Sequence, residues 1–249
     1  MFELVQVADS EAEGAFDEAF KGAKGVISTP IILNADPAKV VEPVVKGTIS
    51  SLEAAARAGV KRYVLSSSSK AVESTNYNHP HHITSTMFNY DAIMKACCEP
   101  NVDGFDRFVD VFSASRALAE LAFWSWVGTN QPPFVANCVV PDGQFGRALD
   151  PENTTPTFRM LKAAAEGEWD KVFGSVGCST SFGGGAVALP ALVNERGHKL
   201  VKGEDQAVEG RDLSSANGLI IRAESILREI GQQGFASEED ILRNFLDCL

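Results

Sequence analysis

The order of apolar and polar positions along the chain predicts strands that alternate with helices. Short apolar or alternating runs indicate strands, and longer runs with apolar residues three or four positions apart indicate helices. The expected strands are residues 2–9, 24–30, 61–69 and 134–141. The expected helices are residues 12–23, 37–58, 91–97, 109–129, 156–166, 214–230 and 237–249. This alternation is typical of an α/β protein with a mostly parallel sheet.

The pattern changes after residue 141. Residues 1–150 are expected to form the α/β core, and residues 151–249 a small, mainly helical region packed on it. Residues 174–185 are rich in Gly and Ser and are expected to form a loop. The resulting fold class is α/β, with helices flanking the sheet.

Two expected helices carry signals at their ends. Gly59 is placed to end the helix over residues 37–58, because glycine adopts the left-handed conformation of a helix C-cap at little cost. Ser113 or Ser115 is expected to cap the start of the helix over residues 109–129.

Composition narrows the classes of partner. The formal net charge is −11, which argues against nucleic acid and anionic membrane surfaces. No basic segment followed by an apolar run opens the sequence, and no run of about 18 apolar residues occurs in it. A cytoplasmic location is therefore expected. The five cysteines lack the spacing of a disulfide framework, which fits a reducing compartment.

Several motifs occur in an order that resembles one enzyme family. Residues 43–55 fit the pattern Pro-x-x-x-Gly-Thr-x-x-x-Leu-x-Ala-Ala, and residues 60–68 read Val-Lys-Arg-Tyr-Val-Leu-Ser-Ser-Ser. Residues 112–116 read Phe-Ser-Ala-Ser-Arg, and Pro141 precedes a Phe-Gly pair. From residue 2 to roughly residue 161, the chain resembles the extended short-chain dehydrogenases/reductases, in the branch that includes dihydroflavonol reductase and aldehyde and ketone reductases. The resemblance implies a Rossmann-like sheet, here reduced because its first βαβ unit is not in the sequence.

The cofactor motif of that family does not occur in this sequence. The family binds the pyrophosphate of its dinucleotide at a G-x-x-G-x-x-G turn between a strand and a helix. The Gly183–Gly185 run has no such context. Only Asp9, where a family Asp contacts the adenine, remains as a vestige. We therefore expect no cofactor, with NAD(P) expected only if the chain is a reductase seen without its N-terminal segment.

Two further departures concern the chemistry of the active-site helix. The family writes Tyr-x-x-x-Lys where this chain has Phe112 and Arg116, and the family Tyr moves the proton at the substrate oxygen. Phe112 has no hydroxyl and is expected to line the substrate pocket. Arg116 can hold a carboxylate or phosphate or polarise a carbonyl, but an ion pair with Glu120 is equally compatible with the spacing. The family Ser corresponds best to Ser68, which can also simply cap the strand end.

The histidines at 79, 81 and 82 lie where the family covers its substrate. Their spacing matches no zinc motif, so no metal is expected. His81 is instead a candidate acid–base group near neutral pH, beside Ser68 and Arg116 as catalytic candidates. Tyr90 and Pro141 join Phe112 as candidate substrate-binding residues.

The missing family strands leave a question about the edge of the sheet. Residues 2–8 lose their neighbour and the strand over residues 24–30 gains an open edge. Three solutions are open: the N-terminal strand pairs with that edge, another subunit or the C-terminal region covers it, or the sequence is a truncated gene product. Trp124 and Trp126 cannot both face the core, so one is expected at an interface, and a homodimer is a candidate assembly.

Three hypotheses for function remain. The first is an enzyme of reductase descent without hydride transfer, which isomerises, dehydrates or cyclises a small, mostly apolar metabolite of secondary metabolism. The second is an NAD(P)-dependent carbonyl reductase seen without its N-terminal cofactor-binding segment. The third is a non-catalytic binding protein.

Overall fold

The chain divides into two compact units. The computed structural model describes residues 3–74, 79–98, 104–141, 150, 156–166, 168, 214–215, 224–232, 240 and 243. One unit comprises Met1–Ser74 and Met87–Asp142, and the other comprises Thr75–Thr86 and Gly143–Leu249. The predicted boundary between the core and the C-terminal region at residue 150 stays a prediction.

A parallel three-stranded sheet lies at the centre of the first unit. Its strands are β1 (Gly25–Ser28), β2 (Arg62–Ser66) and β4 (Val135–Val139), in the order β1-β2-β4. Tyr63 of β2 pairs with Val26 of β1 and with Ala136 of β4. The predicted α/β class with a parallel sheet flanked by helices is confirmed.

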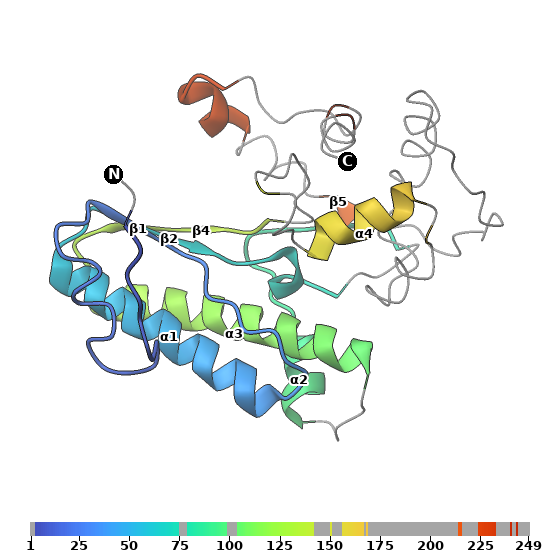
Figure 1. The fold of residues 1–249 in the computed structure, drawn as a ribbon, viewed down its shortest axis with the longest axis horizontal. Helices are drawn as coiled ribbons and strands as arrows, with labels where there is room; N and C mark the ends of the chain where they lie inside the picture. The colour runs from blue at the N-terminus through green and yellow to red at the C-terminus, as the bar shows by residue number, and fades with distance from the viewer. Residues whose placement is uncertain are drawn as a thin grey trace. The chain divides into compact units, whose positions relative to one another are not determined.

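Helices of the first unit pack on one side of this sheet. They are α1 (Pro37–Ala58), α2 (Tyr90–Cys98) and α3 (Phe105–Asn130), and Figure 1 shows α1 and α3 side by side along the strands. Asp36 caps α1, accepting a hydrogen bond of 3.0 Å from the backbone N–H of Ala38. Gly59 ends α1 with a φ of 66°, as its residue type predicts.

Aromatic side chains fill the space between the sheet and the helices. Tyr63 is fully buried, with its ring centroid 5.9 Å from that of Phe123 on α3 and 5.7 Å from that of Phe134. Its hydroxyl donates a hydrogen bond of 3.0 Å to Ser51 Oγ of α1. This buried donor therefore finds a partner, and the contact ties the sheet to α1.

The predicted N-terminal strand is wrong. Residues 3–9 form no strand, and Leu4 and Val5 are 86% and 53% exposed. A strand needs a neighbour to satisfy its backbone groups, and among the described residues β1 pairs only with β2. The pairing of the N-terminal segment with β1 therefore does not occur in the described residues.

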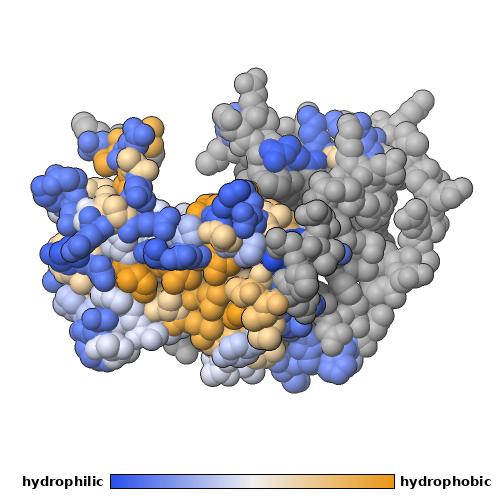
Figure 2. Space-filling view, turned by 90° about the horizontal axis from the view of Figure 1, so that it is seen from below, coloured by the Kyte–Doolittle hydropathy of each residue, from blue (hydrophilic) through white to orange (hydrophobic). Residues whose placement is uncertain are grey.

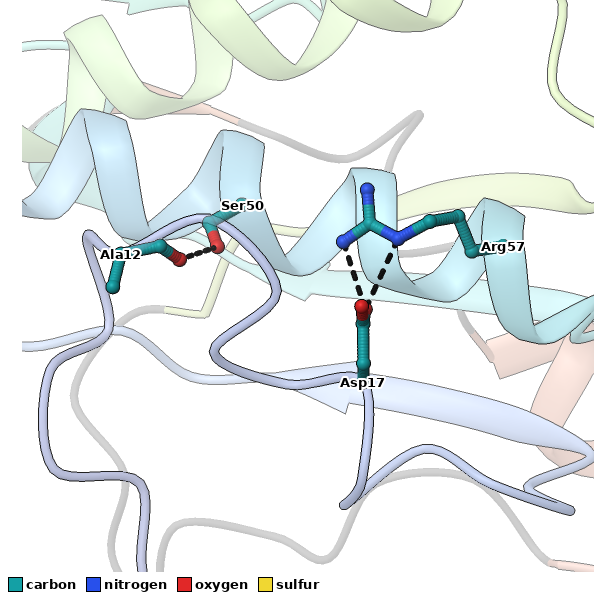
Figure 3. Close-up of polar contacts among 4 residues, drawn as sticks. All are labelled: Ala12, Asp17, Ser50 and Arg57. Carbon is teal, nitrogen blue, oxygen red and sulfur yellow. Dashed lines mark hydrogen bonds and ion pairs between the residues drawn. The ribbon is translucent and has the colours of Figure 1, made fainter.

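Residues 12–23 form successive turns rather than the predicted helix. Side chains of α1 hold this segment, as Figure 3 shows. Ser50 Oγ donates to the carbonyl of Ala12 at 3.0 Å, and Arg57 binds Asp17 through Nε at 3.1 Å and Nη2 at 2.7 Å. These tertiary contacts override the local helical pattern.

The start of α3 also differs from the prediction. The helix begins at Phe105 rather than at residue 109, so Ser113 and Ser115 lie in its interior and cap nothing. Ser115 Oγ instead donates to the carbonyl of Phe112 at 2.7 Å. A serine inside a helix can bond back to its own backbone, which removes the cost of burying its hydroxyl.

In the second unit, β3 (His81–His82) pairs in parallel with β5 (Ser214–Ser215). Helix α4 (Pro156–Ala165) agrees with the predicted helix, and residues 224–229 are helical. The predicted helix over residues 214–230 is wrong at its start, because two residues there form β5. The predicted loop over residues 174–185 and most of the predicted helix over residues 237–249 lie outside the described residues.

The face seen in Figure 2, from the helical side, carries a continuous apolar area. On α3, Trp124 is 41% exposed, whereas Trp126 stacks on Phe134 with ring centroids 6.4 Å apart. The predicted homodimer stays a prediction. No helix within the described residues is long and apolar enough to cross a membrane.

Candidate functional site

The carboxyl ends of β2 and β4 are held together beyond the strands themselves. The N–H of Ser67 donates to the carbonyl of Val139, and the N–H of Ser69 donates to the carbonyl of Pro141, each at 2.8 Å. The short helix η1 (Ser69–Ala71) follows and packs against α3. In parallel α/β sheets this edge is where ligands bind, because side chains from several strand ends converge there.

Ser68 stands at the start of η1. Its Oγ accepts a hydrogen bond of 3.2 Å from the N–H of Lys70, so it caps the 3₁₀ turn. The side chain is half-buried, and its hydroxyl proton is still available to a ligand. The next residue back, Ser67, is buried, and its Oγ has no hydrogen-bond partner.

One face of α3 carries polar side chains into the interior. Ser113, Arg116 and Glu120 are three and four positions apart and therefore share that face. They are 1%, 5% and 7% exposed. Within the described residues, no hydrogen-bond partner is present for Ser113 Oγ, Arg116 Nε and Nη2, and Glu120 Oε2. Buried polar atoms in native proteins are nearly always paired, so this polar face is the candidate for a ligand site in the first unit.

Arg116 is the charged group of this face. Its guanidinium carbon lies 5.8 Å from the centre of the Phe112 ring, one turn toward the start of the helix. The guanidinium thus lies over Phe112, and the ion pair with Glu120 is not formed within the described part of the chain. Burial lowers the pKa of Arg116 to about 10, so the side chain remains charged at neutral pH.

Glu120 lies instead near β4. Its carboxylate and Ser67 are both close to the Cys138 thiol, and burial, followed by the negative charge of Glu120, raises the pKa of that thiol well above its usual value. Cys138 is therefore an inert thiol rather than a nucleophile.

The other candidates divide between the two units. Phe112 is half-buried beside Arg116, and the carbonyl of Pro141 accepts from Ser69. Tyr90 begins α2 and is 61% exposed. The first unit thus holds Ser68, Arg116, Phe112, Pro141 and Tyr90.

His81 belongs to the second unit, where its Nδ1 lies 2.8 Å from the carbonyl of His79. Across the described residues, no three His, Cys, Asp or Glu side chains gather to hold a metal. Asp9 is exposed, and its Oδ1 accepts from the N–H of Glu11 at 2.8 Å, which closes a local turn.

Ser67, Ser113 and Glu120 were not among the residues predicted for the site. A signal for the last two exists in the sequence, because polar residues at 113, 116 and 120 keep helical spacing within an otherwise apolar helix. For Ser67 the sequence offers only its place in a serine run. The parallel sheet, the helices on it and the polar carboxyl edge together define a Rossmann-like α/β protein.

Comparisons with known proteins narrow this class. No family model matches the chain. The chain is 36% identical to aldehyde reductase 2 of Sporidiobolus salmonicolor over 155 residues, which cover 61% of this chain and 45% of that protein. It is 30% identical to the NAD-dependent epimerase/dehydratase terH of Aspergillus terreus over 207 residues, which cover 78% of this chain and 61% of the relative. The chain thus spans about half the length of the curated relatives it matches.

Solved structures show the same fold. Gre2 from Candida albicans, solved in complex with NADPH, superposes with a TM-score of 0.64 at 15% identity, covering 97% of this chain and 82% of Gre2. Together with the sequence relatives, this shows that the chain belongs to the extended short-chain dehydrogenase/reductase superfamily.

The expectation that the protein needs no cofactor is wrong. The relatives bear the names of reductases and of an NAD-dependent epimerase/dehydratase, and Gre2 binds NADPH in its crystal structure. The error came from treating one glycine-rich turn as the whole cofactor site.

Proposed function

We propose that this protein is an NAD(P)-dependent oxidoreductase that acts on a carbonyl compound. The observation that carries the proposal is the buried guanidinium of Arg116, whose Nε and Nη2 have no partner, on the helix that packs at the carboxyl edge of the sheet. A charge in that position requires a ligand. The names of the sequence relatives indicate which chemistry such a ligand undergoes.

The residues present fit part of a nicotinamide dinucleotide. The unpartnered donors of Arg116, together with the Ser68 hydroxyl, suit a ligand rich in oxygen atoms. The glycine-rich turn by which this family binds the diphosphate does not occur in the sequence. The fit therefore concerns the reacting end of the site.

The bound nicotinamide would supply the hydride for the carbonyl carbon. The chain's own part is to bind and polarise the carbonyl group. Ser68 is placed to donate its hydroxyl proton in a hydrogen bond to the substrate oxygen, which stabilises the negative charge that develops there, and Arg116 binds and orients the substrate. Solvent water then supplies the proton that converts the alkoxide into the alcohol. The ring of Phe112 offers an apolar wall but no proton. Since a positioned proton donor typically contributes about 10²–10⁴-fold, turnover is expected to be slow.

An assay of reduced-nicotinamide consumption tests this proposal. The full chain is mixed with NADPH or NADH and a panel of aldehydes and ketones, and the product alcohol is measured alongside. We expect consumption that depends on the carbonyl compound, and a fall of about tenfold or more in kcat/KM for Ser68→Ala and Arg116→Ala. Arg57→Ala, which removes a surface arginine, is the control and should stay at the wild-type rate. The proposal fails if no carbonyl compound yields alcohol at the expense of the nicotinamide.

Finer features of the first hypothesis remain predictions. They are a role in secondary metabolism, an isomerisation, dehydration or cyclisation step, and a small, mostly apolar substrate. Analysis of the products in the same assay would detect an isomer or a dehydrated compound formed in place of an alcohol.

A further inference from the structure

Three arginines of the first unit differ in the hydrogen-bond acceptors that their guanidinium groups find. Arg57 lies at the surface, and its Nε and Nη2 both donate to one carboxylate oxygen of Asp17 (Figure 3). Arg107 is 8% exposed, and its Nη1 and Nη2 donate to the carbonyls of Lys95 and Ala96, at 2.7 and 2.9 Å. Each of these side chains has acceptors that explain its position.

Arg116 differs from Arg57 and Arg107, because the described residues give it no acceptor at two neighbouring atoms. It is 5% exposed, and these two atoms are Nε and Nη2. These atoms form one edge of the planar guanidinium, the same edge by which Arg57 binds Asp17. Two parallel N–H groups on that edge match the two oxygens of a carboxylate.

We propose that this edge of Arg116 binds a carboxylate of the substrate, so that the protein acts on an oxo acid. This inference rests on the proposed function, because it names the substrate class of the same site. Arg116 is then a specificity-determining residue, which fixes the substrate so that its carbonyl group faces the reacting end of the site.

The charges around Arg116 favour a carboxylate over other oxygen ligands. A buried cation gains most from a group that cancels its charge, and the hydroxyl groups of a sugar are neutral. A phosphate dianion would bring excess negative charge to the helical face that Glu120 already occupies. A single carboxylate leaves the pair neutral. The Phe112 ring beside the guanidinium adds an apolar surface against which the carbon chain of the substrate can pack.

The test is a calorimetric titration of the full chain without nucleotide. The probes are pyruvate and phenylpyruvate, each compared with its own methyl ester, which keeps the carbonyl group and removes the charge. The variants are Arg116→Lys, which keeps the charge but loses the two parallel N–H groups, and Arg57→Lys as a matched surface control. Circular dichroism spectra check that each variant is folded.

We expect at least one acid to bind the wild type tenfold or more tightly than its ester. Arg116→Lys should reduce this acid-over-ester ratio about tenfold, and Arg57→Lys should leave it unchanged. Because the ratio compares two ligands on one variant, a general loss of structure does not imitate the effect. Equal binding of acid and ester, a ratio that Arg116→Lys leaves unaltered, or tighter binding of inorganic phosphate than of either acid would each overturn the proposal.

The carboxylate site and the proposed function can be refuted independently of each other. If the acids bind through Arg116 but no nicotinamide is consumed, the carboxylate site stands and the oxidoreductase proposal falls. If nicotinamide is consumed with carbonyl compounds but acids bind no better than esters, only the carboxylate site falls.

Discussion

Replacing Arg116 with methionine should make the ligand-free protein more stable. Most substitutions of buried residues destabilise a fold. Here the wild-type side chain holds a positive charge inside the protein with Nε and Nη2 unpaired, whereas methionine is uncharged and has a flexible chain that fills the same space. Removing an uncompensated charge is stabilising when the replacement packs well.

The pKa of Arg116 gives the size of this effect. Burial lowers that pKa from its ordinary value to about 10, and each pKa unit corresponds to about 1.36 kcal/mol, so burying the charged form costs about 3 kcal/mol. The folded pKa of this cation lies below its unfolded value, so the penalty is fully present below pH 10 and fades only as the pH rises from there toward the unfolded pKa. Methionine also loses the contact of the guanidinium with the Phe112 ring, which lowers the free energy of unfolding by about 1 kcal/mol. The net gain at neutral pH is therefore about 2 kcal/mol.

Urea denaturation, followed by tryptophan fluorescence, measures this gain as a higher midpoint at an unchanged m value. Two arginines serve as controls. Arg57→Met removes a surface ion pair and should change the free energy of unfolding by less than about 1 kcal/mol. Arg107→Met leaves the carbonyls of Lys95 and Ala96 without their donor and should cost about 2 kcal/mol or more.

The expected order of stability is Arg116→Met, then the wild type and Arg57→Met together, then Arg107→Met. A loss of about 1 kcal/mol or more in Arg116→Met would refute the reasoning, because it would mean that the guanidinium already has a partner in the ligand-free protein.

Three other substitutions test separate parts of the account. Phe112→Tyr restores a phenol at the half-buried ring and should raise carbonyl reduction by about 10²–10⁴-fold, measured as kcat; an unchanged rate would count against the site. Gly59→Ala forces a φ of 66° on alanine and should lower the free energy of unfolding, measured by urea denaturation, by about 1 kcal/mol. Gly128→Ala inside α3 should raise that free energy. Ile27→Lys on the exposed face of β1 should change stability by less than about 0.5 kcal/mol, and a larger loss would show that this face of the sheet is covered.

The sequence predicted the elements whose signals are local. The helix α1 has its Asp36 cap, its Pro at the first turn and Gly59 at its end, and the structure places its bounds as the sequence predicts. The strands β1, β2 and β4 are short apolar runs between turn residues, and the parallel arrangement followed from their alternation with helices.

Errors occurred where distant contacts decide the structure. Alternation at residues 3–9 satisfies the pattern of a strand, but no described strand lies beside it to accept its hydrogen bonds. The helical pattern of residues 12–23 yields to contacts that Ser50 and Arg57 make from α1. The pairing of β3 with β5 joins residues more than a hundred positions apart, which no local pattern reveals.

The sequence predicted several residues of the candidate site, but it did not predict their burial or their contacts. Arg116 was identified from a motif, and its choice between Glu120 and a ligand was left open. The direction in which the side chain leans, toward Phe112, resolves that choice, and only packing around α3 determines it. Burial of the face at Ser113 and Glu120 likewise depends on how α3 packs in the fold.

The most direct test of the central claim is a titration of the full chain with NADPH, with an oxo acid absent or present. Binding is measured by energy transfer from the protein's tryptophans to the reduced nicotinamide. The account predicts saturable binding in the micromolar range that tightens when the acid is added. If NADPH at millimolar concentration produces no saturable signal under either condition, the assignment of a nicotinamide-dependent activity to this chain is contradicted.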